Sequence, residues 1–346
     1  GPTTSSLLER LVASVPELLP GRRVRIHLVD PHVAGAGRVW RPDLHPLLWM
    51  NSMAEDVTMF TDETVRCDGP LWPGPTLFEW SRSVPDATLA ALAGDDALVH
   101  EIRHLTGTTF PTRRVQSVYL RWFHQQVLDA LPDGVEVVAH PQRAVDLVDL
   151  PDGRQRVVLE AADPVDAHLA VLALGHLDAE PDPTSAAHGR FAAEHGLVHV
   201  AAGHTADLDL SVLEPGADVI VLGFGQAFTD LMVLVSEGRG GRFVDRDGRL
   251  AYEPSGLEPV LHVGSRRGVP YRSKLEQHLA APLVPLPRFL DDAGIEALLA
   301  PPGQLEFRRD VLPVLTKEVA WAYYHELFVG HPAAVGTTWD DFAERF

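Results

Sequence analysis

One segment of the 346-residue chain, residues 26–51 (IHLVDPHVAGAGRVWRPDLHPLLWMN), most constrains how the chain can fold. The apolar run from Ile26 to Val29 ends at a single carboxylate, Asp30, and Gly35 and Gly37 follow. An apolar strand that ends in an acid is typical of a doubly wound sheet, in which the carboxylate binds a ribose hydroxyl. The glycines would let the backbone approach a flat or anionic group closely. The segment therefore predicts a nucleotide-binding strand.

The residues before this segment extend the pattern. Gly1 precedes a helical run that begins at Ser5 or Ser6, and the strand Val24–Val29 follows the helix. Free N–H groups at a helix N-terminus suit a phosphate. The first strand and the first glycine of G-x-G-x-x-G are missing from the sequence. Two explanations stay open: the chain is part of a longer protein, or Gly1 and its proline are a cloning remnant before an ordinary helix.

A second strand, glycine turn and helix lie later in the chain. Asp218–Leu222 is the predicted strand, Gly223 and Gly225 form the turn, and Ala227–Ser236 is the predicted helix. A glycine motif between a strand and a helix indicates a nucleotide-binding turn. The third glycine is absent, because Phe228 stands where small residues usually occur. A tight turn without a ligand is the alternative interpretation.

Hydrophobic periodicity and turn residues predict the remaining elements. The predicted helices cover residues 88–104 (with a break at Gly94), 115–131 and 310–328. The last of these is expected to bury Val314, Leu315, Ala320 and Leu327. The predicted strands cover 135–138, a buried run at 168–174 (HLAVLAL) and 260–263, and hairpins are expected at 144–160 and 242–252. Residues 51–80 and 177–215 are expected to be loops.

Composition excludes several classes of function. The chain has 29 Lys and Arg against 48 Asp and Glu, a net charge of −19, which argues against a nucleic-acid or anionic-membrane partner. The single cysteine, Cys67, excludes an internal disulfide and a multi-cysteine metal site, and no H-E-x-x-H motif is present, so we expect no metal. No G-x-S-x-G or P-loop occurs. Without a membrane-length apolar run or a signal peptide, we expect a soluble cytoplasmic protein.

Two glycine turns that each lead into a helix suggest two nucleotide sites, which a flavin and a nicotinamide dinucleotide usually occupy. In the first site, pyrophosphate would bind at Gly1, Ser5 and Ser6, and ribose at Asp30. In the second, pyrophosphate would bind at Gly223, Gly225, Gln226 and Ala227. Arg266 and Arg267 would pair with a 2′-phosphate, which favours NADPH over NADH. A solvated surface pair is the alternative for these arginines.

Longer motifs carry a family resemblance across most of the chain: VDPHVAGAGRVWR, LLWMNSMAEDVTMFTD, GPLWPGPTLFEW, LALGHLD, GFGQAFTDLMVLVSEGRGGRF and AWAYYHELF. The chain resembles the FAD/NAD(P)-binding proteins of actinobacteria, distant relatives of flavin-dependent N-hydroxylating monooxygenases. The resemblance implies an α/β fold with two Rossmann-like domains, an FAD domain (1–200) and an NAD(P) domain (201–275), and a helical segment (276–346). Family members usually begin with a strand and GAGPRGTS, which this chain matches only from the second glycine, with Thr4 at the third. They usually also continue past Phe346.

The resemblance implies an FAD- and NADPH-dependent monooxygenase. Its substrate would be a small polar amine or amino acid, with aspartate, oxidised to nitrosuccinate, among the candidates. A C4a-hydroperoxyflavin formed with O₂ would transfer the oxygen. A homo-oligomer is compatible with the sequence. Two alternatives stay open: an FAD/NAD(P)H reductase or oxidase without oxygen transfer, and a flavin-binding module that needs a partner chain.

Asn51 and Asp56 are the catalytic candidates at the flavin face. A turn asparagine bonded to its own backbone is the alternative for Asn51. Trp40 and Trp49 are interpreted as core residues rather than redox partners, although they could wall the flavin. The predicted cofactor-binding set comprises Gly1, Ser5, Ser6, Asp30, Gly35, Gly37, Arg38, Val39, Trp40, Asn51, Gly175, His176, Gly223, Gly225, Gln226, Ala227, Arg266 and Arg267.

Other polar residues are open to two interpretations. Arg38 and Arg41 could pair with phosphate or with a substrate carboxylate. His176 and His204 could relay a proton, but incidental placement is favoured, because the chain has 17 histidines.

Overall fold

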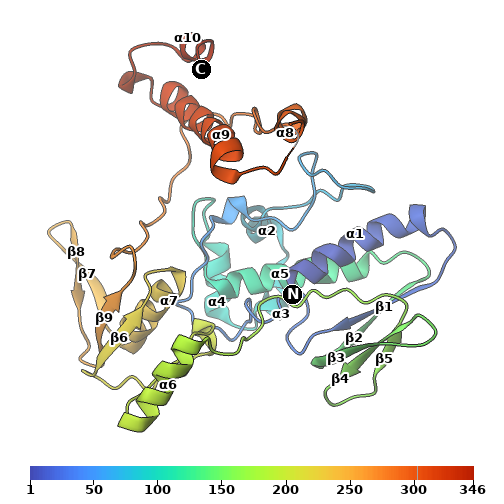
Figure 1. The fold of residues 1–346 in the computed structure, drawn as a ribbon, viewed down its shortest axis with the longest axis horizontal. Helices are drawn as coiled ribbons and strands as arrows, with labels where there is room; N and C mark the ends of the chain where they lie inside the picture. The colour runs from blue at the N-terminus through green and yellow to red at the C-terminus, as the bar shows by residue number, and fades with distance from the viewer. Residues whose placement is uncertain (302) are drawn as a thin grey trace. The chain divides into compact units, whose positions relative to one another are not determined.

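The computed structural model describes residues 1–301 and 303–346, and it contains both helices and short strands, with the run α2–α5 followed by the run β2–β5 (Figure 1). The helices up to residue 274 are α1 (Pro2–Leu18), α2 (Leu77–Ser83), α3 (Asp86–Ala93), α4 (Asp96–Arg103), α5 (Arg113–Asp129), α6 (Pro183–His195) and α7 (Gln226–Val235). The strands are β1 (Val24–Val29), β2 (Val135–His140), β3 (Ala144–Asp149), β4 (Gln155–Leu159), β5 (Val165–Ala167), β6 (Asp218–Leu222), β7 (Arg242–Arg246), β8 (Arg249–Glu253) and β9 (Val260–Gly264). Short 3₁₀ turns lie at Ala54–Asp56, Thr205–Asp207 and Glu237–Arg239.

The predicted strand after α1 forms a parallel pair with β2, in register from Val24 opposite Val135 to Val29 opposite His140. Helices α1 and α5 pack on this pair. Leu8 and Phe123 belong to their buried contact, and Ile26 of β1 packs against it. The apolar residues of each helix recur at three- and four-residue spacing, which places them on one face. The sequence therefore correctly predicted β1 and the presence of α1, α5 and β2. The predicted start of α1 at Ser5 or Ser6 is wrong, because the helix begins at Pro2, and proline suits the first helical position.

A second apolar cluster joins α2, α3, α4 and α5. The fully buried Trp80 and Tyr119 meet at its centre, with ring centroids 5.5 Å apart. The Tyr119 hydroxyl donates to the carbonyl of Pro75 (2.7 Å) and accepts from the N–H of Met59 (3.2 Å). The predicted loop 51–80 is thereby tied to the core, although its last residues, 77–80, already belong to α2. The predicted break between α3 and α4 is confirmed, because Gly94 ends α3 with a φ of 65°.

The other sheets are small. Strands β3, β4 and β5 form an antiparallel sheet, and β7 and β8 form a hairpin, so both predicted hairpins are confirmed. Strands β6 and β9 form a second parallel pair, in register from Asp218 opposite Val260 to Leu222 opposite Gly264. Helix α7 follows β6 directly, as the glycine turn predicts. The parallel pair β1–β2 with α1 and α5 packed on it, and the direct succession of β6 and α7, make this an α/β fold.

The buried strand predicted at 168–174 is wrong. Strand β5 ends at Ala167, and the run after it is irregular, with Leu169 76% exposed and Leu172 65% exposed. Apolar composition alone predicted burial, but a buried strand also needs paired neighbours and covered faces. Within the described part of the chain, no strand pairs with this run.

The loop predicted at 177–215 contains a helix, α6. Asp182 caps its N-terminus, because the Asp182 carboxylate accepts from the N–H groups of Thr184 (2.8 Å) and Ser185 (3.2 Å). Pro183 occupies the first helical position and Gly196 ends the helix with a φ of 63°. The Pro- and Ala-rich composition concealed an ordinary Asp-Pro start and glycine stop.

The chain forms two units, Gly1–Lys274 and Leu275–Phe346, which are described separately. The second contains α8 (Asp292–Leu299), α9 (Leu312–His325), α10 (Trp339–Ala343), a 3₁₀ turn (Pro332–Ala334) and π-helical turns at Phe307–Val311 and Glu326–Gly330. None of the described helices combines the length and the apolar character needed to span a bilayer.

The helix predicted at 310–328 exists as α9 and its flanking turns, but its predicted buried face is wrong. The buried residues of α9 are Glu318 and Trp321, whereas Leu315 is exposed and Val314, Ala320 and Leu327 are only half-buried. The Glu318 carboxylate accepts from three backbone N–H groups of residues 288–290 at 2.7–3.0 Å. These bonds turn the polar face of the helix inward, which apolar periodicity could not predict.

A substitution of Gly35 tests how closely the loop after β1 packs on α5. Gly35 has a φ of 83°, and a Cβ there would lie 2.7 Å from both the carbonyl oxygen of Leu120 and the Cβ of His124. We expect Gly35→Ala to cost about 2–5 kcal/mol, which combines about 1–2 for the left-handed backbone and about 1–3 for overpacking. Gly153→Ala is the control, because Gly153 has a φ of 82° but open space around it. Equal losses in urea unfolding would contradict this packing.

Candidate functional site

The N-terminus of α1 and the end of β1 meet. The amine nitrogen of Gly1 lies 3.2 Å from Asp30 Oδ2, and Asp30 Oδ1 accepts from the N–H of His32 (2.9 Å). Gly37 packs closely against Gly1, since a Cβ at position 37 would lie 2.8 Å from the Cα of Gly1. No side chain caps α1. The structure thus brings together an open helix start, a glycine and a carboxylate, as the sequence pattern predicts.

A buried hydrogen bond between α1 and α5 fixes the start of α1 in place. Ser5 Oγ lies 3.0 Å from His124 Nδ1, and both side chains are buried. Burial lowers the pKa of His124. The imidazole is therefore held neutral beneath Gly35. Ser6, by contrast, is exposed.

A cavity of about 1010 Å³ lies in the first unit, at the upper end of the usual range for small-molecule sites. Its wall is built from segments far apart in the sequence, at residues 38–40, 47, 49–51, 113, 176, 203–207, 226–230, 232–233 and 270–274. Helix α7 presents its first residues to the cavity. No side chain caps α7, whose N-cap is Gly225, so its first N–H groups stay available to an anion.

Two arginines at one side of the cavity share a carboxylate. Arg38 donates from both terminal nitrogens to Asp178 (2.9 and 3.0 Å) and from Nε to Asp207 (2.9 Å), and Arg41 reaches Asp207 at 2.6 Å. Burial opposes ionisation of Asp207, but the bonds from Arg41 and Arg38 outweigh it and lower its pKa. The rings of His176 and His204 lie 5.4 Å apart nearby.

Arg113 and Asp230 form an ion pair on the cavity wall, with Nη2 and Oδ2 2.6 Å apart. The side chains of Arg113 and Asp230 are 21% and 14% exposed. Burial raises the pKa of Asp230 by more than Arg113 lowers it. Arg113 also donates from Nε to the carbonyl of Trp49 (3.2 Å).

The described cavity wall carries more cations than anions. Its cationic side chains are Arg38, Arg113, Arg272 and Lys274, and its carboxylates are Asp207 and Asp230. Lys274 Nζ donates to the carbonyl of Asn51 (2.7 Å). In a chain with a net charge of −19, this cationic excess makes the cavity suited to an anionic ligand.

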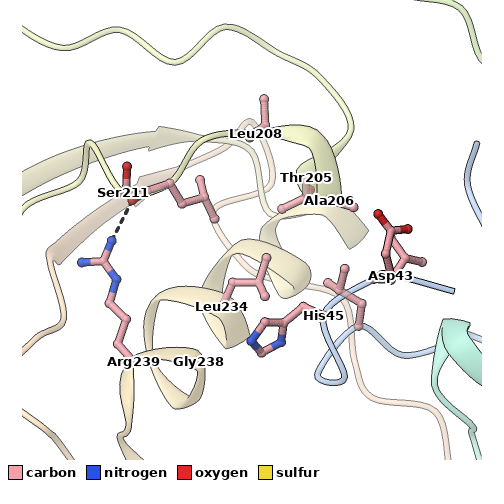
Figure 2. Close-up of a pocket in the computed structure, with 12 residues that line it drawn as sticks. Asp43, His45, Thr205, Ala206, Leu208, Ser211, Leu234, Gly238 and Arg239 are labelled. Carbon is pink, nitrogen blue, oxygen red and sulfur yellow. Dashed lines mark hydrogen bonds between the residues drawn. The ribbon is translucent and has the colours of Figure 1, made fainter. Parts of the chain in front are cut away.

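A smaller pocket of about 340 Å³ borders the same region, and Figure 2 shows Asp43, His45 and Arg239 around it. Arg239 donates to the carbonyls of Leu213 (2.6 Å), Leu210 (2.7 Å) and Leu257 (2.9 Å). Since these bonds hold the loops around the pocket together, Arg239 has a structural role there.

Comparison with known proteins identifies the fold family. A family described as FAD-NAD(P)-binding matches residues 1–177, about half of the chain. The chain belongs to the FAD-NAD(P)-binding family. It is 40% identical over 344 residues to an L-aspartate N-monooxygenase (nitrosuccinate-forming) of Streptomyces davaonensis, covering 94% of this chain and 52% of that protein.

Two further relatives agree with this. A nitrosuccinic acid synthase of Aspergillus oryzae is 38% identical, with 100% of this chain and 51% of that protein covered. An L-aspartate N-monooxygenase (nitrosuccinate-forming) of Streptomyces cremeus is also 38% identical, with 96% and 51% covered. This FAD-NAD(P)-binding chain therefore spans about half the length of the curated relatives it matches.

The structure brings part of the predicted site together on the cavity wall of this FAD-NAD(P)-binding chain, namely Arg38, Val39, Trp40, Asn51, His176, Gln226 and Ala227. Gly223 and Gly225 lie in the turn before α7, and Gly175 precedes His176. Asp56, Arg266 and Arg267 are not among the described residues that line the cavity. The interpretation of Trp49 as a core residue is wrong, because Trp49 is 52% exposed and lines the cavity. Trp40 does pack against the core.

Sequence reasoning missed Arg113, Asp230, Arg272 and Lys274. Arg113 and Asp230 stand 117 positions apart, and Lys274 and Asn51 stand 223 apart. The available signal was weak: Asp230 follows the G-x-G turn by one helical turn, and Arg272 and Lys274 continue the basic run that begins at Arg266.

The buried His124 should make stability depend on pH. The pKa of His124 in the folded protein lies below the ordinary 6.5. As the pH falls, His124 is therefore protonated in the unfolded chain before it is protonated in the folded protein. Stability that is present above pH 6.5 is then lost below it. We expect wild type to lose more unfolding free energy than His124→Gln between about pH 7.5 and 5.5, with up to about 1.4 kcal/mol per pH unit between the two pKa values. Urea unfolding at each pH measures this. Parallel curves would contradict a neutral buried imidazole.

Proposed function

We propose that this chain binds FAD and NADPH and acts in the oxidation of the amino group of a small amino acid, with L-aspartate as the first substrate to test. The observation that carries the proposal is the similarity to two Streptomyces proteins named L-aspartate N-monooxygenase (nitrosuccinate-forming), at 40% and 38% identity over almost all of this chain. The cation-rich cavity adds support, since aspartate carries two carboxylates.

The proposal includes two Rossmann-like domains, an FAD domain at 1–200 and an NAD(P) domain at 201–275, followed by a helical segment at 276–346. Two parallel strand pairs, β1 with β2 and β6 with β9, support this division. Each pair stands beside a helix whose N-terminus no side chain caps. In doubly wound folds, such a helix start holds pyrophosphate and an acid at the next strand end holds ribose.

The residues present fit both dinucleotides. For FAD, the open start of α1 would hold pyrophosphate, and Asp30, close to Gly1, would bind ribose. Gly223 supports the NADPH site, because it has a φ of 128° and open space around it, so backbone and ligand can approach closely. Arg266 and Arg267 are the proposed partners of the 2′-phosphate, and Arg267 lies over the ring of Tyr271 at 4.9 Å, on the segment that reaches the cavity.

When bound, FAD would supply the redox chemistry that activates O₂ after reduction by NADPH. The chain's own residues would bind and orient the amino acid. Arg272 and Lys274 would neutralise its carboxylates, and Trp40 and Trp49 would limit the access of water. Asn51 is proposed to face the flavin, which its position on the cavity wall supports. Asp56 stays a catalytic prediction from the sequence.

Reconstitution tests this function. We expect the purified chain to bind FAD with a visible flavin spectrum, and to oxidise NADPH faster when L-aspartate and O₂ are present. Mass spectrometry should then detect nitrosuccinate. Peroxide without an oxygenated amine would favour a reductase or oxidase, and FAD binding with turnover only after a second polypeptide is added would favour a flavin-binding module. Failure to bind FAD would refute the proposal.

Asp30 gives a residue-level test of the FAD site. Asp30→Ala removes a charged acceptor worth about 1.5–3 kcal/mol, so we expect FAD affinity to fall at least tenfold. Asp149→Ala, on the exposed strand β3, is the matched control and should leave affinity unchanged. Fluorescence titration of flavin gives both dissociation constants. An Asp30 variant with wild-type affinity would remove Asp30 from the site.

A further inference from the structure

Arg113 connects three segments of the cavity wall. Its guanidinium donates to Asp230 of α7 at 2.6 Å and to the carbonyl of Trp49 at 3.2 Å. Its backbone N–H donates to the carbonyl of Leu48 at 2.8 Å. Arg113 is also the first residue of α5, whose buried face anchors the core. One residue thereby joins the segment before Asn51, the central helix and α7.

The partners of Arg113 belong to the two proposed nucleotide sites. Trp49 precedes Asn51, the residue proposed to face the flavin. Asp230 lies one helical turn into α7, directly after the Gly223–Gly225 turn proposed for NADPH. The guanidinium is planar and rigid, and its donors point in fixed directions, so it fixes distance and orientation together.

We propose that Arg113, through its bond to Asp230, is a positioning residue that holds α7 and its glycine turn at a fixed place relative to the Trp49–Asn51 segment. This inference rests on the proposed function, because it concerns how the two dinucleotides face one cavity. Arg113 would thus affect the relative placement of the two dinucleotides indirectly, by positioning α7 and the segment before Asn51.

Stability alone does not explain a largely buried ion pair at this place. Replacement of such a pair by apolar residues of similar volume is often neutral or stabilising, because the cost of desolvating both charges disappears. Removal of one partner, in contrast, leaves an uncompensated charge and costs about 3–5 kcal/mol. A double apolar variant can therefore keep the fold and remove only the directional contacts.

The test uses the double variant R113M/D230L. We expect its melting temperature to stay near that of wild type, whereas hydrogen exchange of α7 amides becomes about tenfold faster or more. This readout needs no cofactor. In the FAD-loaded protein, flavin reduction by NADPH should slow by about 10²-fold, because a displacement of about 1 Å can have that effect. The affinity for NADP⁺, measured calorimetrically, should change by less than about threefold, since the glycine turn itself is intact.

R156M/D166L is the matched control. Arg156 and Asp166 form an equally close ion pair (2.6 Å) on strands β4 and β5. Neither residue lines the cavity among the described residues. This variant should leave α7 exchange and flavin reduction at wild-type values.

R113K is the second variant, and it serves if the double variant does not fold. Lysine keeps the positive charge opposite Asp230 but lacks the planar fork, so α7 should stay protected while amides of residues 48–51 exchange faster. Wild-type exchange and reduction rates in both variants would overturn the proposal. So would a loss of NADP⁺ affinity with unchanged α7 exchange, because Arg113 would then contact the ligand directly. A wild-type protein that does not use NADPH would instead refute the proposed function.

Discussion

The close contact between the loop after β1 and helix α5 is the constraint on which the first site depends. At Gly35 the loop backbone lies so near to α5 that a methyl group would meet the Leu120 carbonyl and the His124 side chain at 2.7 Å. This contact sets where Gly37 lies, and Gly37 in turn touches Gly1 at the start of α1. The bond from Ser5 to His124 fixes α1 to the same helix. A single buried helix thus aligns the glycine loop, the helix start and the carboxylate of Asp30.

Local patterns predicted most elements of the fold because the relevant signals act within a few residues. The break at Gly94 and the turn at Gly223 could be read directly, since glycine supplies backbone geometry that other residues avoid. The prediction failed where tertiary surroundings decide. The run 168–174 is apolar enough for a buried strand, but burial needs neighbouring strands. Glu318 faces inward because three distant N–H groups bind its carboxylate, and helical periodicity contains no information about them.

The same distinction between local and distant signals applies to the residues of the candidate site. Residues in continuous motifs, such as Arg38 to Trp40 and Gln226 to Ala227, do lie on one cavity wall. Arg113 and Lys274 were missed because their partners stand 117 and 223 positions away, and nothing local marks either residue as a cavity residue. Trp49 was interpreted as a core residue but is 52% exposed, whereas Trp40 does pack against the core.

The uneven charge distribution has a consequence for the kinetics of ligand capture. An anion far from the protein encounters a net charge of −19 and is repelled, whereas the cationic excess of the cavity acts only at short range. Salt screens the distant repulsion first, because charges separated by more than about 8 Å are largely screened at physiological ionic strength. Moderate salt should therefore raise the association rate of an anionic ligand. The same ions should weaken the attraction between the bound ligand and Arg272 and Lys274, and so lower its affinity. Rate and affinity would then respond to ionic strength in opposite directions.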